Sequence, residues 1–210
     1  MLYFEKKKRL IWGILSLLVF LNFALWLVIF DLTSRQNLKI VFFDVGEGDA
    51  IFIETPKRKQ ILIDGGPDFT ILEKLAQEMP FYDKTLDLVI LTHPEYDHLK
   101  GLIEVVRRYK VRNIVWTGIV RRTYEWEEWK ELIQKENVKI ADSPGKIILE
   151  GGELCMKNLQ AELRNSEKIP YCIYLEVLYP FQSFFGKEFK NSNDTSIVVK
   201  LVFGDISCLF

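Results

Sequence analysis

Two histidines and two acidic residues lie close together in the middle of the chain. His93, Glu95, Asp97 and His98 fall within six consecutive positions, and the 210 residues contain no other histidine. Imidazole nitrogens and carboxylate oxygens are common ligands of divalent metal ions, and a turn can direct several of them to one point. We therefore predict that these four residues bind metal.

The elements around this cluster must hold it in place. An apolar run over residues 86–91 predicts a buried strand that delivers His93 at its end, and a helix is predicted over residues 99–109. Strands and helices alternate along the rest of the domain, which indicates an α/β layered fold. The other predicted elements are strands at 39–44, 50–55, 60–64, 113–117, 146–149, 174–178, 196–203 and 206–210 and helices at 70–78 and 124–136.

The first thirty residues differ from the rest. Residues 1–9 are basic, and residues 10–30 carry no charged side chain. As a helix this run would be about 30 Å long, the thickness of the hydrocarbon core of a bilayer. We predict a transmembrane helix at 10–30, with residues 1–9 cytoplasmic, a linker at 31–38 and the domain 39–210 outside the cell membrane. A cleaved signal peptide fits less well, because no small residues follow the run.

Charge and cysteine usage restrict the other functions. A formal net charge of -1 argues against a broad phosphate-binding surface, so nucleic-acid contacts must be local. Lys57, Arg58 and Lys59 form the basic group that we predict, weakly, to contact DNA. The chain has three cysteines without C-x-x-C spacing, and we predict that they are core residues and not disulfide or zinc ligands.

Several segments resemble one protein family. Residues 92–101, THPEYDHLKG, resemble the H-x-x-x-D-H signature of the metallo-β-lactamase superfamily. The branch of ComEC-type DNA-uptake proteins has similar segments in the same order, here DVGEGD at 44–49, LIDGG at 62–66, LYP at 178–180 and NDTS at 193–196. The similarity runs from about residue 40 to Phe210.

This resemblance implies a four-layer αββα fold with a metal site at the edge between two sheets. His93 would bind one ion, Asp97 and His98 a second, and Asp64 would orient ligands or handle protons. Glu95 stands where many hydrolases of the superfamily have histidine. Because only two histidines are available, we expect oxygen ligands and predict Mn²⁺ or Mg²⁺ in preference to Zn²⁺, with Asn193 or Asp194 near a further ligand position.

Two metal ions would activate water, so hydrolysis is the expected reaction. The resemblance implies a membrane-anchored nuclease that cleaves DNA outside the cell, with single-stranded DNA and other DNA-uptake components as partners. Hydrolysis of a β-lactam or thioester, and a non-catalytic accessory role, are the alternatives. The family has a Thr-Gly-Asp whose aspartate bridges the metals. We expect the reading frame to continue into it beyond Phe210, which would leave the C-terminal half incomplete here, and activity depends on that.

Overall fold

The chain forms two compact units. The computed structural model describes residues 2–33, 37–150 and 172–210, and the units are Met1–Gln36 and Asn37–Phe210. The first unit is one helix, α1 (Leu2–Thr33). This helix includes residues 2–9 of the predicted basic tail and residues 31–33 of the predicted linker.

Helix α1 exposes apolar side chains along much of its length, among them Trp12 and Trp26. Within the part of the chain that the structure describes, however, no helix combines the length and the apolarity needed for a membrane span. The side chains of Leu10, Val28 and Phe30 lie outside that part. The span predicted at 10–30 therefore remains a prediction.

The second unit contains a large mixed sheet and a smaller antiparallel one. The large sheet has the order β1-β2-β3-β5-β7-β8, the smaller one β12-β11-β10-β9, and β4 pairs with β6. In chain order the strands are β1 (Lys39–Phe42), β2 (Ile51–Glu54), β3 (Gln60–Ile63), β4 (Thr85–Leu86), β5 (Leu88–Ile90), β6 (Lys110–Val111), β7 (Ile114–Trp116), β8 (Val138–Ile140), β9 (Gly145–Glu150), β10 (Ile173–Tyr179), β11 (Val198–Phe203) and β12 (Ile206–Leu209).

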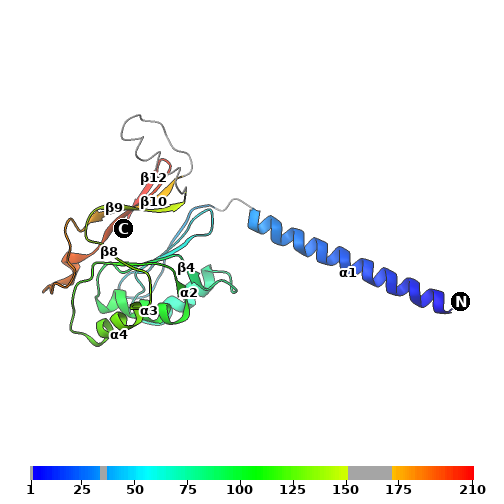
Figure 1. The fold of residues 1–210 in the computed structure, drawn as a ribbon, viewed down its shortest axis with the longest axis horizontal. Helices are drawn as coiled ribbons and strands as arrows, with labels where there is room; N and C mark the ends of the chain where they lie inside the picture. The colour runs from blue at the N-terminus through cyan, green and yellow to red at the C-terminus, as the bar shows by residue number, and fades with distance from the viewer. Residues whose placement is uncertain (1, 34–36, 151–171) are drawn as a thin grey trace. The chain divides into compact units, whose positions relative to one another are not determined.

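Strand direction changes halfway across the large sheet. β1, β2 and β3 are antiparallel hairpin strands, whereas β3, β5, β7 and β8 are parallel. Parallel neighbours need crossover connections, and these contain the helices α2 (Thr70–Glu78), α3 (Tyr96–Arg108) and α4 (Tyr124–Ile133). Figure 1 shows the three helices together on the face of the large sheet that is turned away from the second sheet. The parallel strands therefore end at one common edge.

Alternating residues of the large sheet face two separate cores. Phe52, Leu62 and Val89 pack with the helices, whereas Ile53 and Ile61 pack against the second sheet. This period of two is expected for a sheet buried on both faces. The described residues thus form three layers, helices, sheet and sheet. They contain no further helix except a short 3-10 turn, η1 (Ser192–Thr195), so they do not supply the second helical layer of the predicted αββα fold.

Several predicted elements need correction. Helix α3 begins at Tyr96, earlier than predicted, so Asp97 and His98 lie in its first turn. Strand β8 was not predicted, because Lys139 interrupts its short apolar run. Strand β12 is a sheet edge with an exposed Leu209, and not the buried strand that the apolar sequence indicated. A tight turn at residues 204–205, with Gly204 at φ +58, connects the predicted strands at 196–203 and 206–210.

The cysteines also differ from the prediction. Cys172 is disulfide-bonded, whereas Cys208 in the edge strand β12 carries a free thiol. Cys155 lies outside the described residues. The prediction that no cysteine forms a disulfide is therefore wrong for Cys172. An odd number of cysteines does not by itself indicate a disulfide, so the sequence did not predict this bond.

Candidate active site

The residues with metal-binding side chains gather where the parallel strands end. Asp64 directly follows β3, and Thr92 and His93 follow β5. These strands are parallel neighbours, and the Asp64 amide donates to Ile90 O at 2.9 Å. Carboxyl ends of adjacent parallel strands share one edge of a sheet, which is the usual place for a site in α/β folds.

Asp64 is the most enclosed acid at this edge, with 2% of its surface exposed. Its carboxylate accepts hydrogen bonds from the Thr92 amide (2.8 Å) and the Thr92 hydroxyl (2.6 Å) and contacts His98 Nδ1 (2.9 Å). The residue has φ +56, a left-handed conformation that aspartate tolerates better than most residues. Its oxygens are occupied, so Asp64 orients its neighbours, consistent with the orienting role that the resemblance implied.

His98 presents one ring nitrogen to the site. An ionised carboxylate only accepts hydrogen bonds, so the Nδ1 that faces Asp64 carries a proton, and in the neutral ring Nε2 keeps its lone pair. Burial opposes protonation of His98, but the hydrogen bond that His98 donates to Asp64 and the charges of Asp64, Asp97 and Asp49 together raise its pKa. Asp97 Oδ2 lies 3.7 Å from His98 Nε2. A histidine held through Nδ1 by a carboxylate is the usual arrangement behind a metal ligand.

His93 is oriented by two hydroxyl groups. Its Nδ1 lies 3.0 Å from Thr92 Oγ1 and 3.2 Å from Ser196 Oγ. Both hydroxyl protons are already donated, the first to Asp64 and the second to the Asn193 carbonyl. His93 Nδ1 must therefore be the donor, which leaves the lone pair on Nε2. Burial, and then the neighbouring His98, lower the pKa of His93 and keep its ring neutral.

The two imidazole rings lie next to each other. The ring centroids are 4.1 Å apart, and His93 Nε2 is buried without a hydrogen-bond partner. A buried polar atom without a partner is costly unless something binds it. A divalent ion fits this atom. Among the described residues, however, no group of three or more His, Cys, Asp or Glu is already gathered around one point, so the side chains do not form the predicted set of four ligands.

Glu95 has a different environment from the other acids. Its carboxylate pairs with Arg121 Nη2 at 3.1 Å and accepts a hydrogen bond from the Ser192 hydroxyl. These contacts join the loop after β5, the loop after β7 and η1. Because the Glu95 charge is neutralised by a guanidinium, the structure does not favour its prediction as a metal ligand.

Two glycines allow the helix to approach the sheet edge closely. A Cβ atom on Gly101 would lie 1.8 Å from Gly65 O, and one on Gly65 would lie 2.5 Å from the Leu102 amide. The Gly65 amide donates to His98 O at 3.0 Å. Close backbone packing at these positions is what brings His98 over Asp64.

The remaining predicted site residues lie elsewhere. Asn193 and Asp194 are exposed in η1, and the Asp194 carboxylate accepts a hydrogen bond from Asn191 at 3.1 Å. The residue of this segment that reaches His93 is Ser196. Lys57, Arg58 and Lys59 precede β3, whereas Asp64 follows it, so this basic group is at the opposite end of the strand from the histidines. Its predicted DNA contact is untested.

Four residues that hold the side chains of this site through hydrogen bonds or an ion pair were not predicted from the sequence. Thr92 and Ser196 orient His93, and Arg121 and Ser192 hold Glu95. Thr92 adjoins the histidine motif and Ser196 closes the 193–196 motif, so both lay inside recognised segments. The contact between Arg121 and Glu95 could not be predicted from local sequence, because the two residues are 26 positions apart in the chain.

Comparison with known proteins identifies a similar family domain and a similar protein. Residues 59–162 match the model of the beta-lactamase superfamily domain. ComE operon protein 3 of Bacillus subtilis (strain 168) is 27% identical over 175 residues, which cover 74% of this chain and 21% of that protein. The chain therefore spans about a fifth of the length of this relative.

Metallo-β-lactamases are among the solved structures to which the chain is similar. One is a Cronobacter sakazakii enzyme described by its HARLDQ motif, with a TM-score of 0.48 and 13% identity over 81% of this chain and 58% of that one. Another is the Rm3 metallo-β-lactamase, with a TM-score of 0.44 and 14% identity over 87% of this chain and 63% of that one. The family model over residues 59–162 and the B. subtilis relative, together with the histidine motif, support a ComEC-like protein of the metallo-β-lactamase superfamily.

Proposed function

We propose that the chain is a metal-dependent hydrolase that cleaves phosphodiester bonds of DNA. The observation that carries the proposal is the pair of oriented imidazoles, in which His93 Nε2 is buried without a partner and His98 is held by Asp64. DNA as substrate is supported by the ComEC-like motifs and by the relationship to ComE operon protein 3.

The chain's own residues prepare the site for this reaction. A bound divalent ion would supply Lewis acidity toward a phosphoryl oxygen and a water. His93 and His98 would hold it through Nε2, with Asp97 beside His98. Asp64 and Thr92 keep both Nδ1 protons in place, which prevents the rings from turning. The low number of histidines favours Mn²⁺ or Mg²⁺ over Zn²⁺ in this proposal.

The direct test is cleavage of a labelled single-stranded oligonucleotide by the purified full chain in detergent. Mn²⁺, Mg²⁺ and Zn²⁺ are supplied separately, and bound metal is measured on the same samples. We expect cleavage with Mn²⁺ or Mg²⁺ and a loss of about 100-fold or more in His93→Ala and His98→Ala. Asp142→Asn, which changes an exposed acid, is the matched control and should cleave normally. Stoichiometric zinc after growth in manganese would contradict the metal preference.

A second function is favoured by one observation. No group of three metal-binding side chains is gathered among the described residues, which suits an accessory module that binds DNA or metal without turnover. Metal binding that depends on His93, with no cleavage under any of the three ions, would favour this module. Turnover of nitrocefin without cleavage of DNA would instead favour another activity of the superfamily.

We also propose that α1 anchors the chain in the cell membrane with the domain outside. Its exposed apolar side chains support an apolar environment, and the disulfide at Cys172 supports an oxidising compartment. Alkaline extraction of membranes from expressing cells should leave the chain in the pellet. Release into the supernatant, or a Cys172 that is reduced in intact cells, would contradict the proposal.

A further inference from the structure

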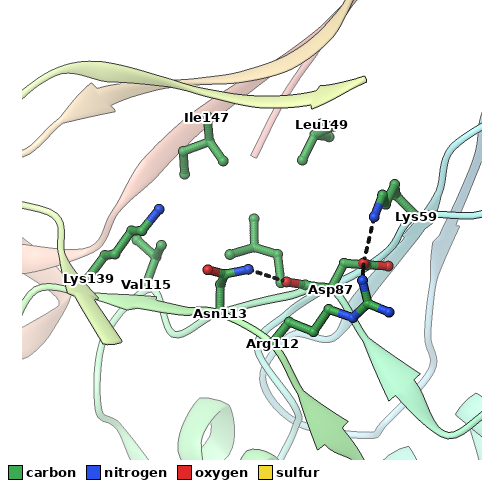
Figure 2. A pocket seen from close by; sticks show the side chains of 9 residues that line it. Lys59, Asp87, Arg112, Asn113, Val115, Lys139, Ile147 and Leu149 are labelled. Atoms are coloured by element: carbon green, nitrogen blue, oxygen red, sulfur yellow. Dashed lines mark hydrogen bonds and ion pairs between the residues drawn. The ribbon is translucent and has the colours of Figure 1, made fainter. Parts of the chain in front are cut away.

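A cavity lined by both charged and apolar residues lies at the other end of the parallel strands. It has a volume of about 250 Å³, and four charged residues line it, Lys59, Asp87, Arg112 and Lys139. Lys59, Asp87 and Arg112 come just before β3, β5 and β7, whereas Lys139 lies within β8. Figure 2 shows Lys139 on one side of the cavity and Lys59 and Arg112 on the other, where both reach Asp87.

This cavity is separate from the candidate active site. Asp87 precedes β5 and Thr92 follows it, so the two residues are five positions apart in an extended segment. At about 3.3 Å per residue their backbones are roughly 17 Å apart. A ligand of the cavity therefore would not touch the histidines, and the following inference does not depend on the proposed function.

The charges in the cavity do not cancel. Asp87 Oδ1 pairs with Lys59 Nζ at 3.0 Å and Arg112 Nη1 at 3.4 Å, and Asp87 Oδ2 accepts from the Gln60 amide at 3.1 Å. One carboxylate thus serves two cations, and Lys139 has no ion pair with the described residues. A guanidinium has five N–H donors in a planar fork, so Arg112 keeps donors for another acceptor. The cavity offers an excess of positive charge to an anion.

The walls of the cavity are apolar. Leu88 and Val115 line it from the large sheet, and Ile147 and Leu149 line it from β9 (Figure 2). Lys139 is the register partner of Val115, which brings its stem to the same inner face of the sheet. A volume of 250 Å³ equals that of about eight water molecules in the liquid, which leaves room for roughly ten non-hydrogen atoms. A bare inorganic ion would leave the apolar walls unused.

We propose that this cavity binds a small organic anion, a carboxylate or phosphate group attached to an apolar body about the size of one aromatic ring. Arg112 and Lys139 bind the anionic group, and Leu88, Val115, Ile147 and Leu149 enclose the ring. Asp87 holds Lys59 and Arg112 in position at the rim.

The probes for the test are 4-fluorobenzoate, 4-fluorophenyl phosphate and the neutral 4-fluorobenzamide. Each is titrated against the full chain in detergent by ¹⁹F NMR, with blank micelles measured in parallel. We expect saturable binding of at least one anion and binding at least tenfold weaker for the amide. Preference between the two anions identifies the group that the site favours. Equal binding of the amide, or no saturable binding of either anion, would overturn the proposal.

Variants place the binding in this cavity. Arg112→Gln and Lys139→Met keep most of each side chain's length and remove its charge, and each should weaken anion binding at least fivefold. Lys135→Met removes an exposed charge outside the cavity and should leave binding unchanged. Methyl resonances of Ile147 and Leu149 should shift on titration even if one variant folds poorly. Equal weakening by Lys135→Met, or unshifted methyl resonances under saturation, would contradict the assignment.

Discussion

Asp64 and Glu95 are two carboxylates beside the same histidine segment, and their partners differ in kind. Asp64 is buried and binds Thr92 and His98, so its charge sets the direction of an imidazole. Glu95 is half-buried and binds Arg121 and Ser192, so its charge is neutralised within a joint between loops. Each carboxylate thus acts through its nearest partner: Asp64 orients the His98 imidazole, and Glu95 connects the loops around the histidines.

Replacement of Asp64 should have the largest effect. Asp64→Ala removes the acceptor for three buried donor groups and places alanine at a positive φ, and we expect a loss of about 3–5 kcal/mol in the free energy of unfolding. Asp64→Asn tolerates the same backbone conformation and should lose less. Urea denaturation measures both variants. If Asp64→Ala were as stable as Asp64→Asn, the carboxylate would not organise this edge of the sheet.

The Thr92 hydroxyl connects Asp64 with His93, so its removal should have the next largest effect. Thr92→Val keeps the shape of the side chain and removes a partly buried hydroxyl that contacts both residues. We expect a loss of about 1–3 kcal/mol in stability and metal affinity that is roughly 10–100-fold weaker. Thr117→Val removes a buried hydroxyl without a hydrogen-bond partner and is the control. If Thr92→Val left the metal affinity unchanged, the orientation of His93 by Thr92 would not contribute to metal binding.

Neutralising Glu95 should affect stability and leave metal binding intact. Glu95→Gln can still accept a hydrogen bond from Ser192, but it leaves Arg121 without its charged partner. We expect a loss of about 1 kcal/mol, because the pair is partly exposed to solvent, and the same number of bound ions as in the parent. Mass spectrometry under native conditions counts the ions. If Glu95→Gln bound one ion fewer than the parent, Glu95 would be a metal ligand after all.

The smallest effect is expected for Ser196→Ala. His93 Nδ1 retains the Thr92 hydroxyl at 3.0 Å after the contact with Ser196 at 3.2 Å is lost. We expect a change of about 0.5–1 kcal/mol in the free energy of unfolding and a few-fold change in metal affinity, measured by calorimetric titration. A change as large as that of Thr92→Val would show that η1, and not the end of β5, holds His93.

Local sequence was sufficient for elements whose pattern is repeated over several residues. Helix α2 has the predicted bounds, because apolar residues at helical spacing and its polar flanks agree. The predicted start of α3 is three residues too late. Asp97 and His98 are polar and predict a turn, but they form the first turn of the helix. Strand β12 read as buried because its residues are apolar, yet position at a sheet edge exposes it. Burial depends on neighbours that a single strand does not specify.

The sequence by itself, through residue type and motif order, predicted that His93, Asp97, His98 and Asp64 lie together, and the structure places the other three beside His98. It could not determine which of these residues would bind and which would orient. That was decided by tertiary structure, because the partner of each side chain comes from a distant segment: Asp64 reaches His98 across 34 positions and Glu95 reaches Ser192 across 97. Proton positions on the imidazoles follow from those partners, and so does the availability of each Nε2 atom.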